Sequence, residues 1–152
     1  MSQQQIFRLP QLSVIDVSGT DAATIVHNIT TNEVHALADR QGSESFVTDV
    51  RGKTLGHAGV YRVDNSIRLI GAGGQSERIA EHLDRYTIRE DATPTIRDSE
   101  YVGLVLSPGL AAALTPDLIA SGMLRCVRLS VAGTGVDLYG CRWLGEGSAV
   151  LL

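Results

Sequence analysis

Residues 45–70 read SFVTDVRGKTLGHAGVYRVDNSIRLI, and they carry the clearest structural pattern in the chain. Two groups of turn-forming residues, Arg51-Gly52-Lys53 and Asp64-Asn65, divide it into three runs rich in β-branched and aromatic side chains. Runs of this kind, separated by short turns, are typical of antiparallel strands joined by hairpins. The pattern therefore predicts three consecutive strands, at Ser45 to Thr48, Thr54 to Val63 and Ser66 to Ile70.

The flanking segments predict short helices alternating with further strands. Apolar residues recur at helical spacing from Asp21 to Ile29, and Ser18 with Asp21 has the shape of a capping box. A second helix is expected from about Gln75 to Tyr86, and a third from Pro108 through Leu114, followed by another helical turn from Pro116 to Gly122. The other expected strands are Leu12 to Val17, Thr93 to Ile96, Tyr101 to Leu106, Arg125 to Val131 and Val136 to Trp143.

The order of these elements mixes hairpins with longer strand-helix connections, so it predicts the α+β class. We expect a mixed, largely antiparallel sheet with helices. The chain has 152 residues, about the length that one hydrophobic core covers, and we expect a single domain over residues 1–152.

Composition narrows the range of partners and locations. Hydrophobic residues make up 43% of the chain and charged residues 20%, which suits a packed core. The net charge is -4 and the basic residues are scattered, which argues against a nucleic-acid partner. No apolar stretch approaches the roughly 20 residues that span a bilayer. The polar start, Met1 to Gln5, lacks the pattern of a secretory signal, so we expect a cytoplasmic protein without a membrane span.

Residues that commonly carry chemistry show no strong motif. Cys126 and Cys141 lie outside any C-x-x-C spacing, which favours reduced thiols. A disulfide between them is the alternative if their strands are neighbours. The four histidines show no ligand spacing, so no metal site is expected. The glycine cluster at residues 71–74 follows a strand and precedes a helix, but Ser76 stands where a dinucleotide fingerprint has its last glycine. A plain glycine turn is the simpler interpretation.

Several short strings, in their order and spacing, resemble the folate-binding glycine-cleavage T-protein superfamily of aminomethyltransferases. The resemblance covers nearly the whole chain but only the N-terminal half of a family member, without the C-terminal half and its barrel. The strings are Ser18-Gly19-Thr20-Asp21-Ala22, Thr31-Asn32-Glu33-Val34, Gly52-Lys53, Val60-Tyr61-Arg62-Val63, Leu83-Asp84-Arg85-Tyr86 and Ser107-Pro108-Gly109-Leu110-Ala111.

This resemblance implies a set of ligand-binding positions. Aligning the strand end at residues 60–63 puts His57 where the true aminomethyltransferases carry their catalytic aspartate. Gly71 falls where they carry an asparagine that binds folate. The implied cofactor-binding residues are Phe46, His57, Gly59, Tyr61, Leu69 and Gly71, with no catalytic residue and no metal ligand. The segment Ser148-Ala149-Val150 also lacks the acidic residue that is expected to hold the pterin.

These departures favour the YgfZ-type branch of the superfamily. The resemblance then implies a non-catalytic module that binds tetrahydrofolate or a related pterin and is linked to the maintenance of iron–sulfur enzymes. The branch's K-G-C-Y-x-G-Q-E motif has no counterpart here. One alternative is a tetrahydrofolate-dependent aminomethyl- or methyltransferase, in which His57 or an unidentified carboxylate replaces the missing aspartate. Another is a structural half-domain that assembles with itself or with a partner.

The C-terminal residues favour assembly. Ala149-Val150-Leu151-Leu152 is an apolar run that suits a strand or a core segment. Each large side chain of this kind left in water forgoes roughly 1.5–3 kcal/mol, and an open strand edge invites pairing. We therefore expect a homo-oligomer or a complex with a partner protein.

Overall fold

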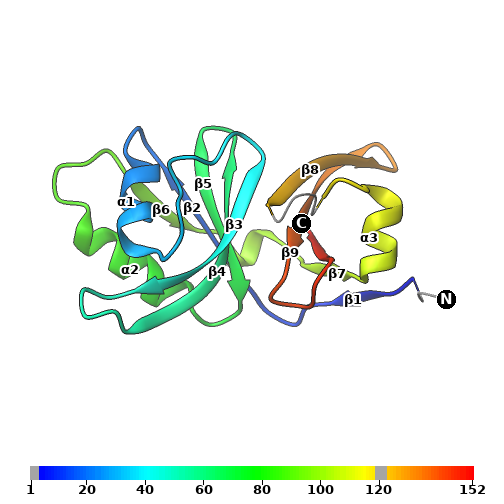
Figure 1. The fold of residues 1–152 in the computed structure, drawn as a ribbon, viewed down its shortest axis with the longest axis horizontal. Coiled ribbons are helices and arrows are strands. Elements are labelled where there is room, and N and C mark those ends of the chain that lie inside the picture. Colours follow the sequence, from blue (N-terminus) through cyan, green and yellow to red (C-terminus); the bar gives the residue numbers. More distant parts are fainter. Residues whose placement is uncertain (1–3, 119–122) are drawn as a thin grey trace.

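The computed structural model describes residues 4–118 and 123–152, which form one extended sheet with helices at its two ends (Figure 1). The strands are β1 (Ile6–Arg8), β2 (Leu12–Ser18), β3 (Gln41–Thr48), β4 (Thr54–Val63), β5 (Ser66–Ala72), β6 (Thr93–Ile96), β7 (Leu104–Leu106), β8 (Leu124–Val131), β9 (Thr134–Cys141) and β10 (Ser148–Leu151). The helices are α1 (Ala22–Ile29), α2 (Ser76–Tyr86), α3 (Pro108–Leu114) and a 3-10 turn η1 (Asp98–Glu100). None of the described helices is long and apolar enough to cross a membrane.

The strand order is β1-β7-β10-β9-β8-β3-β4-β5-β2-β6, and the pairings between the described strands are antiparallel. The predicted α+β class with a largely antiparallel sheet is confirmed. The centre of the sheet is the predicted three-stranded unit β3-β4-β5. Its second turn is formed by Asp64 and Asn65, both at positive φ (48° and 65°), the backbone that a two-residue hairpin requires.

The sheet separates two hydrophobic clusters. On one face, α1 and α2 cover Val47, Val60 and Leu69, together with the apolar side of β2. On the other face, Tyr61 packs with Leu124 and Tyr139, which come from the far half of the sheet. Figure 1 shows that the two halves of the sheet form two lobes, with α1 and α2 in one lobe and α3 in the other. The second cluster joins the lobes into a continuous packed structure.

Polar side chains also connect the lobes. The guanidinium of Arg68 in β5 donates to both carboxylate oxygens of Asp16 in β2, at 2.6 and 2.7 Å. It also donates to the hydroxyls of Tyr139 in β9 at 2.8 Å and Tyr101 at 3.1 Å. Tyr61 of β4 donates to the backbone carbonyl of Gly140 at 2.6 Å, and burial raises the pKa of its hydroxyl well above the ordinary value. The hydroxyl therefore stays protonated as a donor.

Some local predictions needed correction. The capping box at Ser18 and Asp21 is wrong, because Asp21 makes no side-chain cap and instead accepts the backbone N–H of Asp91 at 2.8 Å. The strand predicted from Tyr101 begins only at Leu104, since Tyr101 follows η1 and its hydroxyl reaches Arg68. Residues 116–118 form a turn, and the rest of the segment predicted as helix up to Gly122 lies outside the described residues.

The cysteines are buried and free. Cys126 pairs across the β8–β9 ladder with Tyr139, while Cys141 lies opposite Ser148 of β10, so the two thiols are not cross-strand partners. Burial raises the pKa of Cys141 to about 12. The thiol is therefore protonated and unreactive near neutral pH.

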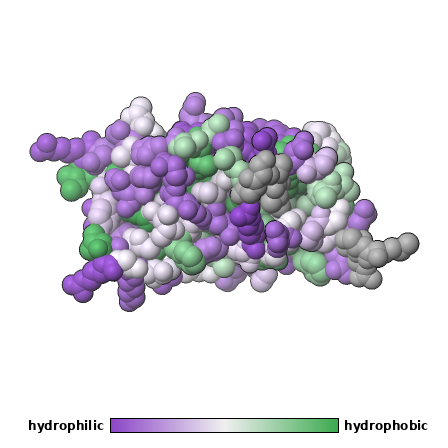
Figure 2. Space-filling view, in the orientation of Figure 1, coloured by the Kyte–Doolittle hydropathy of each residue, from purple (hydrophilic) through white to green (hydrophobic). Residues whose placement is uncertain are grey.

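The C-terminal apolar run is accommodated within the chain itself. β10 lies between β7 and β9, and Val150 is only 1% exposed. The expected exposed terminus and open edge are absent at β10, because β7 returns to pair with it. On the face in Figure 2, hydrophobic residues form small separate groups among hydrophilic ones. The self-association that we expected from the terminus stays a prediction without this support.

Candidate functional site

A pocket opens where β8 diverges from β3. The two strands pair at only two positions, Gln41 with Arg125 and Gly42 with Leu124, while β3 continues along β4. The space next to this divergence has a volume of about 460 Å³. Its lining residues are Thr31, Asn32, Ser43, Glu44, Ser45, Phe46, His57, Leu124 and Arg142.

Phe46 and His57 form one wall of this pocket. They are direct cross-strand partners in the β3–β4 ladder, so their side chains project from the same face of the sheet. Their ring centroids lie 4.9 Å apart. The Phe46 residue is 50% exposed, an unusual position for a large aromatic side chain. The pair offers a flat surface on which a planar ligand can stack.

Glu44 places a carboxylate beside this wall. It lies two residues before Phe46 on β3 and shares its face. Its Oε1 accepts hydrogen bonds from the backbone N–H of Trp143, at 2.7 Å, and from the N–H of Arg142. Its Oε2 lies 3.8 Å from Nε2 of His57. Local sequence patterns could not reveal this arrangement, because the predicted strand began at Ser45 and the backbone amides of Arg142 and Trp143 lie almost a hundred residues further on.

Gln75 holds the backbone of His57. The β4–β5 pairing begins at Gly59, so the Gln75 amide takes the place of a strand partner at His57. Its Oε1 accepts the N–H of His57 at 3.0 Å, and its Nε2 donates to the carbonyl of His57 at 2.8 Å. A Cβ added at Gly71 would lie 2.3 Å from Gln75 Nε2 and 2.5 Å from the His57 carbonyl. Gly71 therefore makes room for the group that positions His57.

Gly71→Ala is expected to lower the free energy of unfolding by about 1–3 kcal/mol, because the added methyl group meets the backbone of His57 and the shift must spread through β4. The comparison is Gly135→Ala in β9, where the nearest atom to an added Cβ is 3.9 Å away. Urea unfolding of both variants measures the difference. Equal midpoints for the two variants would show that Gly71 is not sterically constrained.

The other implied binding residues do not join this pocket. Tyr61 is fully buried in the cluster between the lobes. Gly59 accommodates its ring, since an added Cβ would lie 2.6 Å from the Tyr61 hydroxyl. Leu69 lies on the opposite face of the sheet, under the helices. Of the six residues, the structure brings Phe46 and His57 together, and Gly71 supports them from behind.

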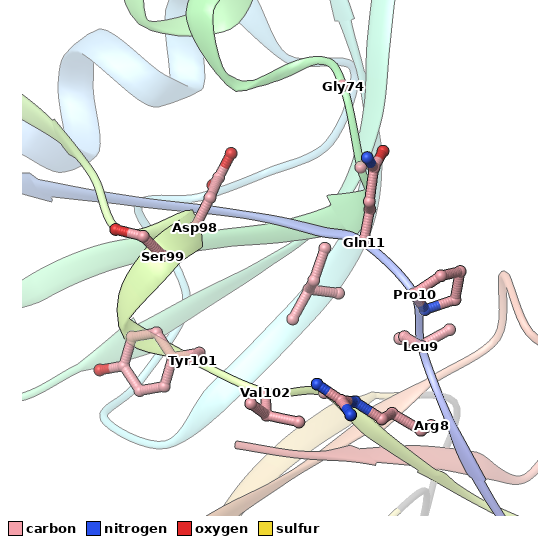
Figure 3. A pocket seen from close by; sticks show the side chains of 12 residues that line it. Arg8, Leu9, Pro10, Gln11, Gly74, Asp98, Ser99, Tyr101 and Val102 are labelled. Atoms are coloured by element: carbon pink, nitrogen blue, oxygen red, sulfur yellow. The ribbon is translucent and has the colours of Figure 1, made fainter.

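A second pocket, of about 420 Å³, lies between the β1–β2 connection and the segment from Asp98 to Gly103 (Figure 3). Its carboxylate, Asp98, already accepts the backbone N–H of Val14 at 2.7 Å and the hydroxyl of Ser76 at 2.8 Å. These bonds fix the start of α2 to β2, which is a structural task. Among residues 4–118 and 123–152, no group of three or more His, Cys, Asp or Glu side chains has an arrangement that would hold a metal ion.

The fold is that of the T-protein aminomethyltransferases. The chain superimposes on the crystal structure of glycine cleavage system aminomethyltransferase T from Bartonella henselae with a TM-score of 0.76 and 17% sequence identity. The match covers 99% of this chain and 42% of that chain. At this identity, the likeness establishes the fold.

Sequence similarity points in the same direction. The chain is 26% identical to a probable aminomethyltransferase from Natronomonas pharaonis, over 96% of its own length and 43% of the relative's. It is 30% identical to another probable aminomethyltransferase from Haloarcula marismortui, over 86% of its length and 39% of the relative's. No protein-family model matches the chain. The chain thus spans about two fifths of these relatives, and fold and sequence together support the T-protein superfamily.

Proposed function

We propose that this chain is a non-catalytic folate- or pterin-binding module of the YgfZ type, linked to the maintenance of iron–sulfur enzymes. The observation that carries the proposal is the joint placement of Phe46, His57 and Glu44 on one face of the β3–β4 hairpin. An exposed aromatic ring beside a carboxylate suits a flat heterocycle with polar edges. The pocket volume of about 460 Å³ lies in the range of small-molecule sites.

His57 is the reason for proposing a module without catalytic activity. In the resemblance, this position carries the aspartate that stabilises positive charge on the folate. An imidazole supplies no fixed negative charge. Glu44 does supply one, but its neighbour at 3.8 Å is the His57 ring, and a protonated imidazole there would offset the carboxylate's field.

The same carboxylate supports a second candidate function, aminomethyl or methyl transfer to tetrahydrofolate. Glu44 lies in the pocket beside His57, so it is the residue that would replace the missing aspartate. Both sequence relatives are named as probable aminomethyltransferases, which favours this alternative. Turnover assays separate the two candidates.

Calorimetric titration with tetrahydrofolate under anaerobic conditions tests the binding proposal. Phe46→Ala is expected to weaken binding about 10- to 100-fold, because stacking on one aromatic side chain is worth roughly 1–3 kcal/mol. The matched control is Phe7→Ala, which removes a phenylalanine that is 55% exposed on β1 and does not line the pocket. Failure of the unaltered chain to bind tetrahydrofolate would refute the proposal. Equal affinities of the two variants for tetrahydrofolate would show that the ligand does not bind at Phe46.

The link to iron–sulfur enzymes needs a test in cells. In a strain that lacks the chain, we expect reduced activity of iron–sulfur enzymes, restored by the unaltered protein but not by the Phe46→Ala variant. Normal iron–sulfur enzyme activity in that strain would contradict this part of the proposal while leaving ligand binding intact.

A further inference from the structure

We infer that Glu44 is the specificity-determining residue of this pocket, and that its Oε2 selects planar heterocycles which present an N–H donor at the ring edge. The inference rests on the proposed function and names the group that would recognise the ligand. None of the sequence strings that carry the family resemblance includes Glu44.

Glu44 is held in place before any ligand arrives. Its Oε1 accepts two backbone N–H groups, from Arg142 and Trp143, which follow the end of β9. Hydrogen bonds from two main-chain donors orient a carboxylate more firmly than flexible side chains can. Binding therefore costs little conformational entropy at this residue, as preorganised recognition requires.

The other carboxylate oxygen, Oε2, has no such backbone donors among residues 4–118 and 123–152. Within the part of the chain that the structure describes, Oε2 makes no hydrogen bond, and Nε2 of His57 lies 3.8 Å away. That distance is beyond a hydrogen bond. The Glu44 side chain is 21% exposed and lines the pocket. An ionised carboxylate only accepts hydrogen bonds, so this atom favours N–H or O–H donors and repels anions.

Two rings beside Glu44 add a requirement for the shape of the ligand. The Phe46 and His57 rings lie on the same face of the sheet as Glu44 and favour a flat molecule over an aliphatic amine. A flat ligand resting on these rings would turn its edge toward the carboxylate. The amino-bearing pyrimidine edge of a pterin has such donors, which is why the inference deepens the proposed function.

Glu44→Gln is the informative substitution. The glutamine oxygen can still accept the N–H groups of Arg142 and Trp143, so the fold is retained while the negative charge is lost. We expect the variant to bind tetrahydrofolate about 10- to 100-fold more weakly, as befits the loss of a hydrogen bond to a charged acceptor. Glu33→Gln makes the same change of charge at an exposed carboxylate that does not line the pocket, and it should bind like the unaltered chain.

A second ligand makes the test specific. The 2-desamino analogue of tetrahydrofolate lacks the exocyclic amino donor, so the unaltered chain should bind it at least about 10-fold more weakly than tetrahydrofolate. The Glu44→Gln variant should bind both ligands with similar affinity. This coupling between residue and ligand would not arise if Glu44 only supported the fold.

The outcomes separate the two proposals. If the unaltered chain binds tetrahydrofolate and the analogue equally well, the inference about Glu44 is overturned while the proposed function stands, even if the Glu44→Gln variant does not fold. Equal affinity of the variant and the unaltered chain for tetrahydrofolate overturns it as well. If the unaltered chain binds neither ligand, the proposed function fails and this inference fails with it.

Discussion

Replacing Asp16 with asparagine is expected to lower the free energy of unfolding by about 3–5 kcal/mol, the usual cost of removing one charge from a buried ion pair. The Arg68 side chain is only 12% exposed. Its Nε and Nη2 donate to the two carboxylate oxygens of Asp16, at 2.6 and 2.7 Å. The asparagine would leave the guanidinium charge buried without a counter-ion. Urea unfolding at neutral pH, with the slope checked for two-state behaviour, measures the effect.

The effect of the Asp16→Asn substitution extends beyond β2 and β5, because Arg68 also donates to the hydroxyl of Tyr139 in the opposite lobe. A shifted Arg68 would loosen the polar contact between the lobes as well as the pair itself. The control is Asp64→Asn, which removes the charge of an exposed partner of Arg40 and does not touch the Asp16–Arg68 pair. Exposed pairs of this kind contribute less than about 1 kcal/mol. A similar loss for both variants would show that burial does not strengthen the Asp16–Arg68 pair.

Purified protein is expected to show no aminomethyltransferase turnover with a lipoyl carrier and tetrahydrofolate. His57 stands where the resemblance expects the catalytic aspartate. Fixed groups that stabilise developing charge are commonly worth a factor of about 100 to 1000 in rate. The assay compares the unaltered chain with a reaction that lacks protein. Turnover near the typical enzyme value of about 10 per second would contradict the prediction and favour the transferase alternative.

His57→Asp provides the matched test of this reasoning. The aspartate would put a negative charge on β4 next to Glu44, on the backbone that Gln75 already holds. Gain of measurable turnover would support the alignment that places His57 at the aspartate position. Turnover in the unaltered chain that disappears in Glu44→Gln would instead identify Glu44 as the working carboxylate.

Much of the fold follows from local patterns in the sequence. The strand at Thr54–Val63 and the strand at Thr93–Ile96 have the predicted bounds, and α1 and α2 begin within one residue of the predicted starts. The reason is that turn chemistry and side-chain periodicity act over a few residues. Asp and Asn residues adopt positive φ at modest cost, so Asp64 and Asn65 mark the hairpin turn wherever it lies in the fold.

The binding site follows from the sequence only in part. The resemblance implied both Phe46 and His57 as binding residues, and the structure shows them to be cross-strand partners in one hairpin. Leu69 was assigned to the same cavity by the resemblance. The structure puts it on the other face, since Leu69 pairs with Val60 and shares that residue's side of the sheet. A shift of one residue along a strand reverses the face, so the resemblance alone could not decide it.

Local patterns in the sequence were enough for the three-stranded centre of the sheet and its antiparallel class, because both depend on contacts between residues close in the chain. Tertiary structure alone placed the Glu44 carboxylate, which is oriented by backbone amides almost a hundred residues away. It also decided that β10 lies inside the sheet between β7 and β9. Contacts over such separations depend on how the whole chain packs, and no local pattern of side chains encodes them.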